Sequence, residues 1–215
     1  MAYGSLLLER RRLHAQIIEA LETLAGDRQD EVASGRSPDQ VDRLAQHAVR
    51  GQVWDKALQY CRQAGDKALA GSAYQEAVGY LEQALEALTH LPPDRLMLEQ
   101  AVDLRSTLSV ALGLLGQGVQ GLTHLREAET LAEGLADHRR LGRLCHRIAS
   151  TLTQMQDYEP ALAYCQRAHA IATALGDVDL QVWINSDMGE IYKDLGDYRQ
   201  ATTYLQQVLT ALQGE

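Results

Sequence analysis

A basic segment at residues 138–147, HRRLGRLCHR, carries the side chains best suited to hold a ligand. Arg139, Arg143 and Arg147 recur at intervals of four, so a helix would place them on one face with His146 beside them. Guanidinium groups bind carboxylates and phosphates through charge-assisted hydrogen bonds. In a chain with a formal net charge of −9, this stripe predicts a site for a carboxylate-rich peptide or a phosphate group.

The alternative for this stripe is ion pairing with the neighbouring segment 178–195, which offers Asp179, Asp187 and Glu190. Most runs of charge are solvated or paired, so this alternative stays open. Two other residues belong to the same predicted surface. Ser150 lies one turn after His146, and Trp183 would anchor a partner if exposed or pack against the adjacent hairpin if buried.

Patterns that could indicate catalysis are better explained by structure. Residues 116–121 spell GxGxxG, but a dinucleotide site needs a strand before the glycines, and residues 104–115 have a helical pattern. Cys61, Cys145 and Cys165 lie far apart and have no metal-ligand spacing, so we expect them to be core residues. We therefore expect no catalytic residue, no cofactor and no metal, and predict that the chain is not an enzyme.

The composition indicates an all-α protein. Ala, Leu, Gln, Glu and Arg dominate, Phe is absent, and no run alternates apolar and polar residues as a half-buried strand would. The acidic net charge argues against a nucleic-acid partner, and no stretch is apolar enough to predict a membrane span. Three cysteines without a disulfide framework are typical of a reducing cytoplasm.

The C-terminal half repeats itself every forty residues. Ala201, Ala161 and Gly121 occupy equivalent places, and each is followed by apolar or small residues four and seven positions later. A fixed period of this size is typical of stacked helical hairpins, none of which can bury its apolar face alone. The sequence therefore predicts a stack in which the small residue lets two helices approach closely.

Short turns join the helices of each repeat. Gly196 is predicted to end one helix in a left-handed conformation, and Asp197 is predicted to cap the next, which begins with Tyr198. In the N-terminal half, Ser72 is a predicted cap of the same kind.

The N-terminal half repeats at twenty residues instead. The pattern at Trp54 recurs at Tyr74, which indicates that a helix over 54–70 belongs to two successive hairpins. We expect helices near 5–25, 38–50, 54–70, 73–90, 94–115, 118–135, 138–155, 158–175, 178–195 and 198–213. The predicted organisation is a junction helix and loop at 1–36, irregular helices at 37–91 and a regular array at 92–215.

These residues resemble tetratricopeptide (TPR) repeats. In the last unit the family's pattern falls on Gly189, Tyr192, Gly196, Tyr198, Ala201, Leu205 and Val208. The resemblance implies an α–α superhelix of stacked TPR-like helical hairpins and a groove lined by the first helix of each hairpin. It places Arg143, His146, Arg147, Ser150 and Trp183 at positions that face this groove. The complete set of candidate groove or partner-binding residues is Arg139, Arg143, His146, Arg147, Ser150, Trp183, Asp187 and Glu190.

The beginning of the chain is similar to the junction that follows STAND- or AAA-type ATPase modules in bacterial signalling proteins, often fused to adenylate or guanylate cyclase domains. This resemblance implies a fragment of a larger regulatory protein, with a protein or peptide partner that could be an ATPase or cyclase domain of the same chain. Leu6, Leu13, Ile17, Leu21 and Leu24 predict an amphipathic N-terminal helix that needs covering. Exposed terminal helices would also allow a homodimer.

The sequence thus predicts a cytoplasmic, non-catalytic protein-interaction scaffold. One alternative is a sensor that binds a small phosphorylated ligand or nucleotide in the groove. Another is a structural homodimerisation module.

Overall fold

The computed structural model describes residues 2–27 and 38–213, whose regular structure is entirely helical. The chain divides into two compact units, Met1–Leu115 and Gly116–Glu215. The first unit contains α1 (Ala2–Asp27), α2 (Pro38–Gly51), α3 (Trp54–Ala70), α4 (Tyr74–Thr89) and α5 (Arg95–Leu114). The second contains α6 (Gly118–Gly134), α7 (His138–Gln154), α8 (Tyr158–Leu175), α9 (Val178–Asp194) and α10 (Tyr198–Gln213).

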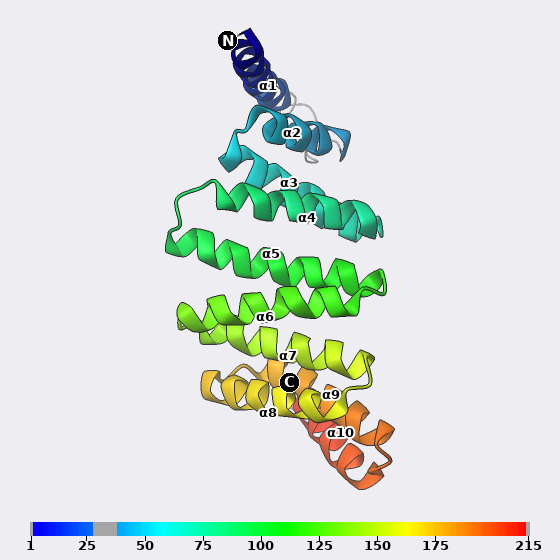
Figure 1. Cartoon of the computed structure of the whole chain (residues 1–215). Helices are drawn as coiled ribbons and strands as arrows, with labels where there is room; N and C mark the ends of the chain where they lie inside the picture. The colour runs from blue at the N-terminus through cyan, green and yellow to red at the C-terminus, as the bar shows by residue number, and fades with distance from the viewer. Residues whose placement is uncertain (1, 28–37, 214–215) are drawn as a thin grey trace. The chain divides into compact units, whose positions relative to one another are not determined.

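Within each unit every helix packs against the next one in the sequence, as Figure 1 shows. In the first unit α3 packs against both α2 and α4, as the twenty-residue repeat predicts. In the second unit α7 packs against α8 and also against α9. The predicted all-α fold of TPR-like helical hairpins is confirmed. The predicted organisation places boundaries at 36/37 and 91/92, the second of them at the prolines Pro92 and Pro93. This three-part division stays a prediction.

The turns of the second unit follow the predicted chemistry. Gly196 has a φ of 80°, the left-handed conformation that glycine adopts without strain. The Asp197 side chain accepts a hydrogen bond from the backbone nitrogen of Gln200 at 3.1 Å, so it caps α10 as expected. The prediction for Ser72 was wrong: this residue has a φ of 60° in the turn, and Ala73 precedes α4 without a side-chain cap.

Small residues fill the interface between paired helices, as the repeat predicts. Ala161 is fully buried and Ala201 is 5% exposed. The predicted core cysteines, Cys61, Cys145 and Cys165, are buried and free. Burial raises the pKa of Cys145 to about 11 and that of each of the other two to about 12, so these thiols stay protonated and unreactive at neutral pH.

The glycines of the GxGxxG segment form a turn, as expected. Gly116 has a φ of 75° between the end of α5 and the start of α6 at Gly118, so helix and not strand precedes the segment. The segment therefore lacks the strand that a dinucleotide site requires. None of the described helices is both long and apolar enough to span a membrane.

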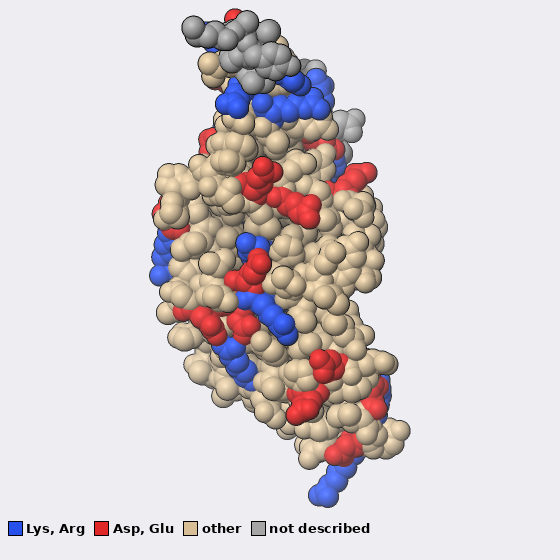
Figure 2. Space-filling view, viewed as in Figure 1, with Lys and Arg blue, Asp and Glu red and all other residues tan. Residues whose placement is uncertain are grey.

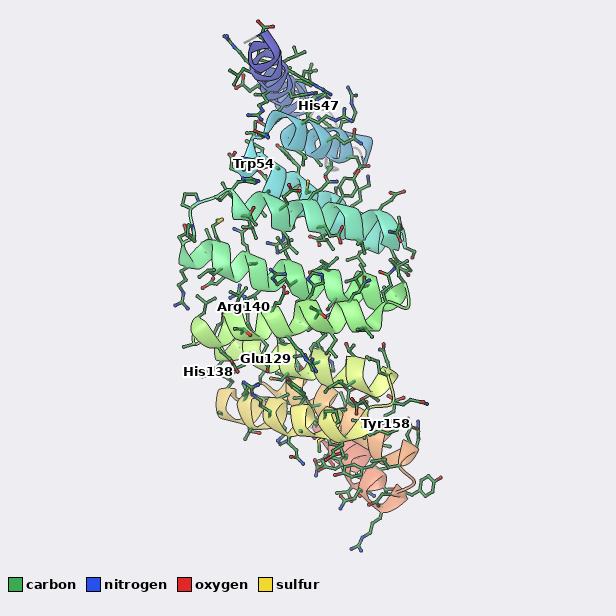
Figure 3. All side chains as sticks on the ribbon, viewed as in Figure 1. His47, Trp54, Glu129, His138, Arg140 and Tyr158 are labelled. Atoms are coloured by element: carbon green, nitrogen blue, oxygen red, sulfur yellow. The ribbon has the colours of Figure 1, made fainter. Side chains whose placement is uncertain are left out.

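The buried face of α1 differs from the predicted one by one residue. Leu13 and Leu24 are more than half exposed, whereas His14 and Ile18 are buried. The side chain of Leu6 lies outside the described residues. The reason for the shift is that polar contacts set the rotation of α1: Gln40 donates to the carbonyl oxygen of Leu21, and His14 contacts His47 on α2. Figure 3 labels His47.

His14, which is buried, and His47, which is half-buried, form an imidazole pair between α1 and α2. Their Nδ1 atoms are 2.8 Å apart, so one nitrogen must donate and the other must accept. Burial lowers the pKa of His14, and Arg10 and Arg50 lower it further. Burial also lowers the pKa of His47, as do His14, Arg50 and Arg43. The folded first unit therefore favours the neutral pair.

We expect the first unit to lose stability as the pH falls below the unfolded histidine value of about 6.5. Below that pH the unfolded chain binds protons that the folded pair resists, and the loss is at most about 1.4 kcal/mol per histidine for each pH unit. The measurement is the urea midpoint of the first unit at pH 7.5 and 5.5, followed by Trp54 fluorescence. A His14→Gln/His47→Gln variant should show a smaller dependence, and an equal or larger one would contradict the prediction.

Candidate functional site

The predicted basic stripe lies on α7, whose start is fixed by Asp137. The Asp137 side chain accepts a hydrogen bond from the backbone nitrogen of Arg140 at 3.0 Å and another from its guanidinium group at 2.6 Å. Burial opposes ionisation of Asp137, but these bonds from Arg140 outweigh it and lower the pKa of the carboxyl group. Arg140 is thus engaged within its own helix turn (Figure 3).

Three of the predicted site residues come together between α7 and α9. His146 Nε2 lies 3.0 Å from Asp187 Oδ2, an ion-pair distance without the alignment of a hydrogen bond. The ring of His146 also stacks on Trp183, with the ring centroids 6.1 Å apart and the planes 27° from parallel. Trp183 is 54% exposed, so one side of its ring packs on His146 and much of the rest faces solvent.

The three arginines of the stripe differ from His146 in having no acidic partner among the described residues. Arg139 and Arg143 are exposed and Arg147 is half-buried, and none of the three forms an ion pair with a described residue. Burial lowers the pKa of Arg147, because a cation taken out of water without a partner is disfavoured. His146 thus lies at ion-pair distance from an α9 carboxylate, whereas Arg139, Arg143 and Arg147 do not.

The remaining predicted residues lie at the edges of this cluster. Ser150 is half-buried on α7, and Glu190 is exposed on α9 with its carboxylate 4.0 Å from the Lys193 amine. We call the surface formed by Arg143, His146, Arg147 and Trp183 the α7–α9 surface. Its chemistry is an aromatic face beside unpaired guanidinium groups, which suits an anionic group attached to an apolar or aromatic one.

The sequence missed a second set of polar residues, which joins α6 to α8. Glu129 on α6 is 9% exposed and accepts hydrogen bonds from Tyr164, at 3.1 Å, and from Arg167 on α8. Arg167 also pairs with Glu133. Figure 3 labels Glu129, and Figure 2 shows basic and acidic side chains side by side over this part of the second unit. Their separation of 35 to 38 residues, close to one repeat, is the signal that could have revealed them.

A single hydrogen bond ties the start of α8 to the end of α9. The hydroxyl group of Tyr158 donates to Asp194 at 3.4 Å (Figure 3). No group of three or more metal-ligating side chains occurs among the residues that the structure describes.

Comparisons with known proteins agree with this fold. Residues 142–214 match the family model of the tetratricopeptide repeat. A search of the curated proteins found no match. Among solved structures, aspartyl phosphate phosphatase F from Bacillus subtilis is similar over 82% of this chain, with a TM-score of 0.71 and 15% identity. The aligned part is 45% of that protein, so this chain spans about half of its length.

Two other solved structures have the same fold. The Rap conjugation gene regulator of the plasmid pLS20, solved with a Phr peptide, is similar over 95% of this chain and 63% of its own, with a TM-score of 0.67 and 15% identity. The TPR-like repeats of a putative kinesin light chain from Podosopora anserina are similar over 92% of this chain and 95% of theirs, with a TM-score of 0.65 and 18% identity. Residues 142–214 thus match the tetratricopeptide repeat, and the chain has a TPR-like fold.

Proposed function

We propose that the chain is a non-catalytic scaffold that binds a peptide segment on the α7–α9 surface. The observation that carries the proposal is the exposed Trp183, held by His146 next to guanidinium groups that have no acidic partner among the described residues. Peptide binding also suits the fold, because a protein of similar fold was solved with a bound peptide.

The unpaired arginines favour a peptide that carries negative charge. Arg147 is half-buried and unpaired, so a carboxylate placed beside it would offset the cost of removing the cation from water. Arg143 lies one turn earlier on the same face and is exposed. The two together favour a peptide with acidic residues at neighbouring positions.

Trp183 favours a peptide that also contains an apolar or aromatic residue. Because its indole is fixed by the His146 ring but more than half exposed, it can stack on an apolar or aromatic residue of the partner with little loss of side-chain freedom. The proposed ligand is thus an acidic segment that contains an aromatic or large apolar residue.

The test begins with peptides selected by this protein from a random display library. We expect acidic sequences with an aromatic residue to be enriched. By fluorescence anisotropy, the Arg143→Glu/Arg147→Glu variant should bind a selected peptide at least about tenfold more weakly, because each charge-assisted bond contributes about 1.5–3 kcal/mol. Arg199→Glu, an exposed arginine on α10, is the matched control and should not change binding. Equal binding by both variants would remove the two arginines from the proposal.

The finer part of the proposal concerns where the peptide comes from. The similarity of the N-terminal residues to a junction behind ATPase modules favours a segment of an ATPase or cyclase domain in the same polypeptide. Reading the complete gene tests this directly, because a frame without such a module upstream would refute it.

The unpaired guanidinium groups also favour a second candidate, a small phosphorylated ligand or nucleotide on the same surface. A bound ligand would raise the melting temperature by mass action. A thermal-shift screen with inorganic phosphate, nucleotides and sugar phosphates separates this candidate from peptide binding.

Exposed apolar side chains favour a third candidate, a homodimer. Leu209 and Leu212 on α10 are 57% and 58% exposed, and Leu13 and Leu24 on α1 are similarly uncovered. Light scattering at several concentrations tests this candidate, and a mass of about 24 kDa at all of them would refute it.

A further inference from the structure

A pocket of about 530 Å³ opens between α8, α9 and α10, the last three helices in Figure 1. It is lined by amide, hydroxyl and imidazole side chains together with small apolar ones, and no Asp, Glu, Lys or Arg lines it. The lining residues that matter here are His169, Gln181, Asn185, Thr203, Gln207 and Ala211. None of them belongs to the α7–α9 surface.

Asn185 gives the pocket an unpartnered polar group. This side chain is 8% exposed, and its Oδ1 atom is buried without a hydrogen-bond partner. A buried amide in that condition costs free energy, because water no longer satisfies it and the protein does not replace the water. No Asp, Glu, Lys or Arg lies among the residues around it.

The forty-residue repeat shows what normally occupies this space. Subtracting forty from His169, Gln207 and Asn185 gives Glu129, Arg167 and Cys145. One repeat earlier, Arg167 pairs with Glu129 and Glu133, and the buried Cys145 lies close enough for these charges to act on its pKa. An ion network therefore fills the equivalent site between α6, α7 and α8.

A second filling group is also missing from the last repeat. The side chain of Ile171 packs so closely on Gly142 that a Cβ atom there would lie 3.0 Å from its Cγ2. Forty residues later the equivalents are Ala211 and Val182, and both line the pocket. Three of these replacements remove volume or charge from the site: Ile171 becomes Ala211, Glu129 becomes His169 and Arg167 becomes Gln207.

We propose that this pocket binds the carboxamide of a Gln or Asn side chain on a peptide. A carboxamide offers both a donor and an acceptor, so it can pair with the Asn185 amide and with the hydroxyl and amide groups of Thr203 and Gln207. A carboxylate would be disfavoured, because no Lys or Arg lines the pocket to replace its hydration. This site is separate from the α7–α9 surface and does not depend on it.

Asn185 is the sole asparagine of the chain, which makes the test direct. Protein labelled with ¹⁵N only at asparagine gives one side-chain amide signal, and this signal is followed during titration with N-acetyl-glutamine methylamide. We expect a saturable shift with a Kd on the order of 1 mM, typical of so small a ligand. The corresponding glutamate derivative should bind at least about tenfold more weakly.

The second part of the test uses variants that place the side chains of the preceding repeat in the pocket. His169→Glu/Gln207→Arg should rebuild the ion pair inside the pocket and abolish the shift, and Ala211→Ile should weaken it by filling space. Gln120→Arg, at an exposed position on α6, is the matched control and should leave the titration unchanged. Retained binding in the filled variants would overturn the proposal, as would an unshifted Asn185 signal or equal shifts with the glutamate derivative. A shift caused only by neutral sugars, tested with glucose, would refute the carboxamide assignment.

Discussion

Arg167→Met should lower the free energy of unfolding of the second unit by about 2–3 kcal/mol. Glu129 is 9% exposed and depends on Arg167 and Tyr164 for its hydrogen bonds, so the substitution leaves a buried carboxylate with one neutral partner. The expected loss is below the ~3–5 kcal/mol of a fully buried pair, because 39% of the Arg167 side chain is exposed and water can partly replace it.

The two tryptophans allow this loss to be measured in one unit. Trp54 lies in the first unit and Trp183 in the second, and they are the two tryptophans of the chain. In a Trp54→Phe background, urea unfolding followed by fluorescence therefore reports on the second unit. The Glu129→Leu/Arg167→Met variant should recover most of the lost stability, since no charge then remains buried. A single variant that unfolds at the same urea concentration as the parent would show that the ion network contributes nothing.

Gly65→Ala should destabilise the first unit by about 1–3 kcal/mol, although alanine is the better helix former. A Cβ atom on Gly65 would lie 2.8 Å from Cγ and 3.0 Å from Cδ2 of Leu81. Leu81 is fully buried, so it has no room to withdraw. The cost of this overlap exceeds the gain in helix propensity, which is about 1 kcal/mol.

A second glycine, which also packs against a leucine, allows the sizes of the two stability losses to be compared. Gly189 is placed against Leu205 as Gly65 is against Leu81, with a Cβ distance of 2.9 Å to Cγ. Leu205 is 44% exposed and can move, so Gly189→Ala should cost less than Gly65→Ala. The matched control is Gly79→Ala on α4, where a Cβ atom would meet nothing within 4 Å.

Gly79→Ala should raise stability by roughly 0.5–1 kcal/mol, because it gains helix propensity without a clash. Urea unfolding in a Trp183→Phe background, with Trp54 as the reporter, measures Gly65→Ala and Gly79→Ala in the same unit. Gly189→Ala is measured in the Trp54→Phe background. Changes of the same sign for Gly65→Ala and Gly79→Ala would show that close packing does not explain the glycine at position 65.

The sequence by itself determined the features that depend on neighbours along the chain. The spacing of Ala201 from Ala161 predicted the repeat, and Asp197 was correctly identified as a cap because a cap acts on a backbone group three residues away. The burial of the cysteines also followed from their places in the repeat. Such features hold in any helix with these residues, so the tertiary structure did not need to be known.

Contacts between helices were decided by the tertiary structure. The sequence offered three acidic partners for the α7 stripe, and the packing of α7 on α9 selected the pair of His146 and Asp187. The face of α1 was predicted one residue away from the buried one, because a single residue turns a helix by 100° and the contacts with α2 set that rotation.

The pocket beside Asn185 is the clearest example of a feature that the sequence alone did not predict. Each replacement that forms it is visible in the sequence, but whether removed volume leaves a cavity depends on how far three helices close around the gap. That distance is set by the packing of all their side chains together, which no local pattern contains.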